Sequence, residues 1–248
     1  VDSELINVTV TPLISVEPVP DFALAGGVTL SYADAKLTSR LPPTRGDTFE
    51  VEGDDIDIGF TLGVQADLGS RTTVGAMYQS GIDHVLEGDI SGFTQPPFSF
   101  FNGAGEANLD LPPVLSIGVT HGFTDTFRVI AEAEYVGWDS FQDITITSNN
   151  VPTPLVEEQN YDDAVFFALG AEYDVASDIT LRGGVAYDQT PTNNRFRTVR
   201  TPDADCIWLS VGATWEISES IGVDVAYSYL DFMDTDVELR NVPGTTID

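Results

Sequence analysis

Large apolar residues alternate with small or polar residues along most of the chain, with a period of two. In ITLRGGVAY (179–187), every second position except one glycine is large and apolar, and the positions between hold Thr, Arg, Gly and Ala. Successive side chains of a β-strand point to opposite faces, so this period predicts strands, and helical spacing is nearly absent. Ten segments share the pattern: 6–16, 23–32, 58–67, 73–80, 114–122, 127–135, 165–173, 179–187, 208–215 and 221–229.

The connections between these segments are of two kinds, which alternate along the chain. The tight connections are 16–21, 67–72, 122–127, 175–180 and 218–222. The long ones, rich in Pro, Asn, Asp and Gly, are 37–56, 89–108, 140–162 and 189–205. This order predicts an antiparallel meander with its long loops at one end. Transmembrane barrels have this arrangement, with short periplasmic turns and long extracellular loops.

The two faces of the predicted strands differ in a way that favours a lipid environment. A soluble antiparallel sheet buries its apolar face and exposes a charged one. Here the second face is mostly Gly, Ala, Ser and Thr, and aromatic residues gather at strand ends, as in the girdles of membrane barrels. The alternative is a soluble lipocalin-like or sandwich protein, although soluble strands usually have only about 5 to 6 residues. The single charges on the small face are Arg128, Glu132, Glu134, Glu172, Arg182 and Asp224.

Composition narrows the functional classes. The 248 residues include 40 acidic and 10 basic ones, a formal net charge of −30, which excludes binding to nucleic acid through phosphate attraction. The single cysteine, Cys206, excludes an internal disulfide, and His84 and His121 alone cannot form a zinc site, so we expect no metal or cofactor. No run reaches the roughly 18 to 20 apolar residues of a membrane helix. The fold prediction is therefore all-β, a transmembrane antiparallel up-and-down β-barrel.

Several stretches resemble the FadL family of outer-membrane transporters. They include LGVQADLGSRTTVGAMYQSGIDHVLEGDI (62–90), and the most specific are TLRGGVAYDQTP (180–191) and TPDADCIWLSVG (201–212). Cys206 departs from the pattern, since the family has an Arg there. The resemblance implies a bacterial outer-membrane location and passive uptake of long-chain fatty acids or, in some branches, aromatic hydrocarbons.

The same resemblance implies a barrel of about 14 strands with an N-terminal hatch. Strand direction then suggests that residues 1–248 are one barrel domain, incomplete at both ends, with the hatch, first strands and last strand outside it. Three strands before and one after satisfy the parity, and so do one before and three after. An open sheet in lipid would leave unpaired edges, each polar group at a cost of several kcal/mol.

Two other functions remain as alternatives. A general or substrate-selective water-filled porin would need a wide lumen with charges at a constriction. An outer-membrane hydrolase would have to use His84 with nearby Ser80, but no third residue in the sequence orients the imidazole. No other nucleophile–base pair, phosphate loop or metal cluster is present in the sequence, so we expect no enzyme.

The candidate ligand-binding residues are arginines and clustered phenylalanines. On the small face, two arginines either form a salt-bridge network with nearby glutamates or meet the carboxylate of a ligand or of the hatch. The phenylalanines of TQPPFSFFNGAG (94–105) form either an apolar binding surface or a small loop core. Arginines near 195–200 either receive fatty-acid carboxylates or pair with acidic loops. The residues are Arg128, Arg182, Phe98, Phe100, Phe101, Arg195 and Arg197.

The acidic excess is concentrated in the long connections, with six carboxylates between positions 47 and 57 and four between 157 and 163. These groups either bridge divalent cations to lipopolysaccharide or form a solvated outer surface. The expected partners are therefore a long-chain fatty acid or other hydrophobic small molecule, outer-membrane lipid and lipopolysaccharide, and no nucleic acid.

Overall fold

The computed structural model describes residues 2–40, 48–92, 98–197 and 203–236, and in this part the chain forms one antiparallel sheet of 15 strands. Two short 3-10 turns, η1 (Phe98–Phe101) and η2 (Trp138–Ser140), interrupt it. No helix among the described residues is long and apolar enough to cross a membrane. The strands are β1 (Asp2–Val10), β2 (Leu13–Val19), β3 (Phe22–Arg40), β4 (Thr48–Asp67), β5 (Thr72–Gln79), β6 (Ile82–Ser91), β7 (Gly103–Leu111), β8 (Val114–Gly122), β9 (Phe127–Val136), β10 (Asp143–Ser148), β11 (Val151–Glu158), β12 (Ala164–Ala176), β13 (Ile179–Asp188), β14 (Cys206–Ser218) and β15 (Ile221–Phe232).

The 15 strands make ten antiparallel passes, as the alternation predicts. Five passes consist of two strands that follow one another: β1–β2, β5–β6, β7–β8, β9–β10 and β11–β12. For example, β4 pairs with β5 at one end and with β6 at the other. Two of the interruptions contain proline, at Pro12 and at Pro112–Pro113. Proline has no N–H to donate, so it breaks the ladder of hydrogen bonds within a pass.

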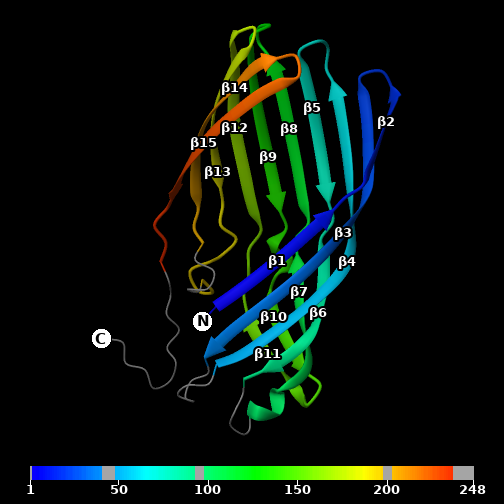
Figure 1. The fold of residues 1–248 in the computed structure, drawn as a ribbon, viewed down its shortest axis with the longest axis vertical. Helices are drawn as coiled ribbons and strands as arrows, with labels where there is room; N and C mark the ends of the chain where they lie inside the picture. Colours follow the sequence, from blue (N-terminus) through cyan, green and yellow to red (C-terminus); the bar gives the residue numbers. More distant parts are fainter. Residues whose placement is uncertain (1, 41–47, 93–97, 198–202, 237–248) are drawn as a thin grey trace.

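All five predicted tight turns lie at the same end of the sheet, the upper end in Figure 1. The long connections lie at the opposite end, but the prediction that 37–56, 89–108 and 140–162 are loops is largely wrong. β3 and β4 remain paired out to Arg40 and Thr48, and β10 and β11 form a hairpin of their own. The described parts of 189–205 are irregular, as predicted, up to the start of β14.

Strands form in these three segments because apolar residues still occupy alternate positions there, although the segments are rich in Asp and Glu. Outward positions carry many of the carboxylates, such as Glu52, Asp83 and Glu87, while apolar residues at inward positions form a core. That core consists of Val51, Ile90, Ala107 and Ile146, with Leu37, Ile144 and Leu155 packed against it. Burial of these inward side chains stabilises the hairpins whatever the charge of their outer face.

Through the middle of the sheet, the face that carries the large side chains is exposed. Val185, Val211 and Val225 are 45%, 62% and 66% exposed, respectively, although all three lie within long, regular strands. A continuous apolar face of this extent is the lipid-facing surface of a membrane barrel. The opposite, concave face carries the small and charged residues, so the predicted assignment of the two faces agrees with the structure.

Candidate functional site

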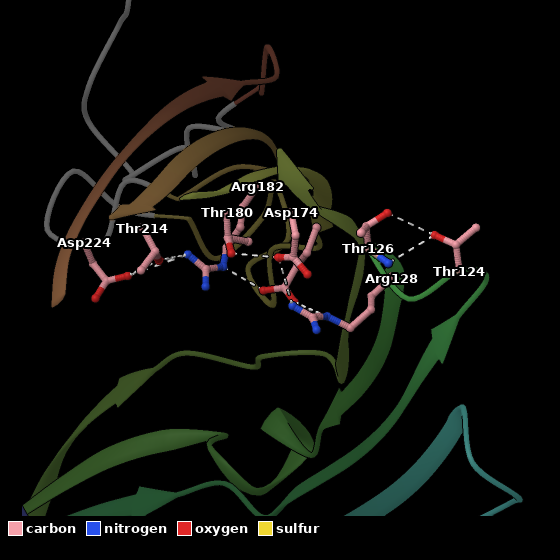
Figure 2. A network of polar contacts seen from close by, with 9 residues as sticks. Thr124, Thr126, Arg128, Asp174, Thr180, Arg182, Thr214 and Asp224 are labelled. Carbon is pink, nitrogen blue, oxygen red and sulfur yellow. Dashed lines mark hydrogen bonds and ion pairs between the residues drawn. The ribbon is translucent and has the colours of Figure 1, made fainter. Parts of the chain in front are cut away.

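A polar network on the concave face joins Arg128, Glu172 and Arg182 (Figure 2). Arg128 Nε donates to Glu172 Oε2 at 2.9 Å, and Arg182 Nε donates to Glu172 Oε1 at 2.6 Å. Both arginines are direct cross-strand neighbours of Glu172, on β9 and β13. The sheet register alone therefore places one carboxylate between two guanidinium groups, and both of its oxygens are used.

The network continues along the next row of residues towards the tight turns. Arg128 Nη2 lies 3.7 Å from Asp174 Oδ1, which also accepts a hydrogen bond of 2.8 Å from Thr180 Oγ1. Arg182 Nη1 donates to Thr214 Oγ1 and lies 3.6 Å from Asp224 Oδ1. Arg128 and Arg182 therefore form the salt-bridge network that was one of the two interpretations of the sequence. A ligand carboxylate would have to compete with Glu172 to bind either arginine.

The other predicted glutamates on the small face do not join this network. Glu134 Oε2 instead accepts a hydrogen bond of 2.7 Å from Ser116 Oγ on the neighbouring strand β8. Glu132 lines an open hollow of about 600 Å³ on the concave face.

Arg197 is buried and holds a loop, contrary to both roles considered from the sequence. Its side chain is 7% exposed, and its Nη1 donates to Asn194 Oδ1 at 2.7 Å and to the carbonyl oxygen of Asp236 at 3.1 Å. Its Nε and Nη2 bind Thr192. Arg195 lies over the ring of Phe196, 5.4 Å from its centroid. Among the described residues, the partners of these two arginines are neutral: an amide, a hydroxyl, backbone carbonyls and a ring, rather than acidic side chains. Arg200 lies outside those residues.

The predicted phenylalanine cluster coincides with η1. Phe98, Phe100 and Phe101 belong to this single 3-10 turn, and Phe100 is 61% exposed. Phe93 and residues 94–97 lie outside the described part of the chain. An apolar binding surface at this turn remains a prediction.

A buried polar cluster that sequence analysis missed surrounds His84. Its Nδ1 is 2.8 Å from Asp55 Oδ2 and its Nε2 is 3.0 Å from Ser31 Oγ, so Asp55 and Ser31, not Ser80, are its partners. The order hydroxyl, imidazole, carboxylate is that of a nucleophilic triad. However, the side chains of Ser31 and His84 are completely buried, and Asn7 Nδ2 donates to Ser31 Oγ at 2.8 Å. No substrate carbonyl can reach this hydroxyl, so the cluster ties strands β1, β3, β4 and β6 together.

An apolar cavity of about 290 Å³ lies among the long hairpins, between β1, β3, β6, β7, β10 and β11. One wall is a cluster of aromatic rings from η2 and the β11–β12 connection, in which Phe141 and Tyr161 have centroids 5.2 Å apart and Trp138 and Tyr161 5.7 Å. None of the seven predicted site residues lines this cavity. The apolar residues that do so include Leu5, Leu37, Leu86, Leu109, Trp138, Phe141 and Ile144.

The polar rim of the cavity is acidic. Burial raises the pKa of the Asp110 carboxyl above its usual range, and the negative charges of Asp83 and Asp143 raise it further. Glu157 also lines the cavity. No Lys or Arg of the described segments lines it. The site therefore offers a ligand apolar contact and an environment that disfavours negative charge.

Comparison with known proteins agrees with this geometry. Residues 1–246 match the family described as "Outer membrane protein transport protein (OMPP1/FadL/TodX)". The chain belongs to this family. A crystal structure of a Pseudomonas aeruginosa FadL homologue superposes with a TM-score of 0.88 at 26% identity, over 98% of this chain and 63% of that one. The protein is therefore a β-barrel protein of the bacterial outer membrane.

Curated relatives of this FadL-family chain are similar over most of its length. The "47 kDa outer membrane protein" of Pasteurella multocida is 26% identical over 87% of this chain and 55% of that protein. The "Long-chain fatty acid transport protein" of Escherichia coli O6:H1 is 25% identical over 79% of this chain and 47% of that protein. The chain thus spans about half the length of these curated relatives. Its relatives are named as membrane proteins and transporters.

Proposed function

We propose that the protein takes up hydrophobic molecules passively across the outer membrane, with long-chain fatty acids as its cargo. The observation that carries the proposal is the apolar cavity of about 290 Å³ inside the long-hairpin end, lined by leucine and aromatic side chains. Membership of the FadL family and the name of the Escherichia coli relative support the same cargo class. The ten passes form part of a single larger barrel domain, completed by strands and a hatch that lie outside these residues.

Affinity for the cargo comes from burial of its hydrocarbon chain. Each buried CH₂ group contributes about 0.8 kcal/mol, so affinity falls steeply as the chain is shortened. The arginines of the concave face contribute less, because Glu172 already engages both Arg128 and Arg182. The outward apolar face contacts membrane lipid, and the acidic outer positions of the hairpins face the lipopolysaccharide layer.

The test is uptake of radiolabelled oleate by cells that lack their own fatty-acid transporter and express the full-length protein. Ala107 lies in the cavity wall and is 6% exposed, so Ala107→Phe fills the cavity and should reduce uptake per folded molecule. Ala171→Phe, the same substitution on the lipid-facing side of β12, is the control. Uptake that is unchanged in Ala107→Phe would contradict the proposal. A porin would instead show large, steady conductance steps in a planar bilayer and admit small sugars as readily as oleate.

A further inference from the structure

A second cavity lies on the concave face, at the end of the sheet opposite the tight turns, against β9 and β12–β15. Its volume is about 820 Å³, and its lining is largely aromatic and acidic. The rings are those of Trp138, Tyr161, Phe166, Trp208 and Phe232. Trp138 and Tyr161 also line the cavity among the long hairpins, and the two cavities share no other lining residue. These two rings therefore lie between two separate cavities.

The sheet register places one aromatic ring between two carboxylates in this cavity. Glu134 of β9 and Asp188 of β13 are both direct cross-strand neighbours of Phe166 on β12, and all three share the concave face with Glu172. Neighbouring strands lie about 4.8 Å apart, so the backbones of the two acidic residues are about 10 Å apart. A substituted ammonium group placed over the Phe166 ring therefore lies within reach of both carboxylates.

The described residues offer these carboxylates no basic partner. Glu132 and Asp203 also line the cavity, and no Lys or Arg of the described segments does. Glu134 accepts a hydrogen bond from Ser116 Oγ and Asp203 from Thr190 Oγ1, which are neutral donors. The two arginines of the concave face are already engaged in the network nearer the tight turns. The cavity therefore combines aromatic faces with carboxylates whose charge no positive side chain of the described residues balances.

We propose that this cavity binds hydrophobic ammonium ions, with the ammonium group over Phe166 between Glu134 and Asp188 and the apolar part against Trp208. The face of an aromatic ring attracts a cation, and the attraction grows when both are shielded from water. The carboxylates attract the same charge over a longer distance, and the net charge of −30 raises the local concentration of cations. The inference goes beyond the proposed function, because it concerns a second class of ligand in a different cavity.

The experiment compares ligands of similar shape that differ in charge. Binding of phenyltrimethylammonium, its neutral isostere tert-butylbenzene and the anion 4-tert-butylbenzoate is measured by calorimetry at pH 7. The full-length protein is used in nanodiscs of zwitterionic lipid, with empty nanodiscs subtracted. The wild type should bind the cation at least about tenfold more tightly than the anion, because the carboxylates attract the one and repel the other. The neutral isostere measures apolar packing alone.

Four variants separate the site from the general field of an acidic protein. Glu134→Gln and Asp188→Asn each remove one charge and keep the side-chain shape, so each should weaken binding of the cation about three- to tenfold and leave tert-butylbenzene unaffected. Phe166→Leu removes the ring and should weaken binding of the cation by a similar factor. Asp83→Asn, which removes a carboxylate from the exposed face of β6, is the matched control and should leave binding unchanged. An unchanged melting temperature shows that each variant is folded.

Three results would overturn the inference. The first is equal affinity of the wild type for the cation and the anion. The second is equal weakening by Glu134→Gln, Asp188→Asn and Asp83→Asn, which would show attraction by the overall charge alone. The third is loss of cation binding in Ala107→Phe, which would place the cation in the cavity among the long hairpins. Uptake of oleate tests the proposed function separately, so the two can fail independently.

Discussion

Glu172 and Arg182 face each other directly across β12 and β13, with Arg182 Nε 2.6 Å from Glu172 Oε1. The same register places Arg128 of β9 on the other side of Glu172, at 2.9 Å from its second oxygen. The Glu172 side chain is 17% exposed, and both arginines are 41% exposed. The arrangement joins three adjacent strands through one carboxylate, which is a structural role that needs no ligand.

Replacing Arg182 by glutamine should lower the stability of the barrel and spare transport. Loss of this partly buried pair should cost about 1 to 2 kcal/mol, between the values typical of exposed and buried ion pairs. Thermal unfolding in detergent micelles, followed by circular dichroism, measures the loss, and oleate uptake per folded molecule should stay near that of the wild type. Arg71→Gln is the control, because its exposed pair with Asp125 should contribute at most about 1 kcal/mol. A drop in uptake without a change in melting temperature would instead assign Arg182 to ligand binding.

An arginine introduced on the lipid face should lower the free energy of unfolding far more than an arginine at the next position, which points to the concave face. Val185 is exposed on the apolar face of β13, and Val185→Arg should destabilise the protein by roughly 2 to 4 kcal/mol if it lies near the midplane. Ala186→Arg points to the concave face, where Ala168 of β12 is its cross-strand neighbour and Glu132 of β9 lies opposite Ala168 one strand further, and it should be tolerated. Unfolding in urea from lipid vesicles compares the two variants. Equal costs would show that the faces are wrongly assigned.

Truncating His84 should loosen the long-hairpin end of the barrel. His84→Ala leaves Asp55 and Ser31 without their buried partner and creates a cavity, so we expect a loss of about 2 to 4 kcal/mol. Proteolysis of the hairpins in intact cells should increase, and uptake per intact molecule should change little. His121→Ala is the control, since that imidazole lies near the tight turns and is only partly buried. Catalytic turnover of an ester that is lost in His84→Ala would contradict the structural role.

Asp110→Asn should stabilise the protein at neutral pH. Burial, and then the charge of Asp83, raises the pKa of Asp110 in the folded state, so its ionised form is disfavoured by folding. This penalty is fully present above the folded-state pKa and disappears below the unfolded-state value of about 3.9. The melting temperature of Asp110→Asn should therefore exceed that of the wild type at pH 7, and the difference should shrink as the pH falls towards 4. Glu219→Gln, in the exposed β14–β15 turn, should show no such convergence.

Much of the fold follows from the sequence pattern, because the feature that specifies a strand, alternation, is local. The ten passes and the five tight turns coincide with the segments that alternation and turn residues indicate. The hairpins of β6 and β7 and of β10 and β11 were missed for a physical reason. Their outward carboxylates dominate the composition, while inward residues such as Ile90, Ala107 and Ile146 stabilise the strands. Charge on one face of a strand says little about the burial of the other.

By itself, the sequence determined the strand class, the meander order and the lipid-facing side, since each depends on neighbours within a few positions. The tertiary structure alone decided which side chains meet. Ser31, Asp55 and His84 are separated by up to 53 positions and come together only through the register of β3, β4 and β6. A shift of register by one residue would turn each of these side chains to the opposite face of the sheet. Their contacts therefore depend on pairing between strands that are distant in sequence, which the local alternation of residues does not determine.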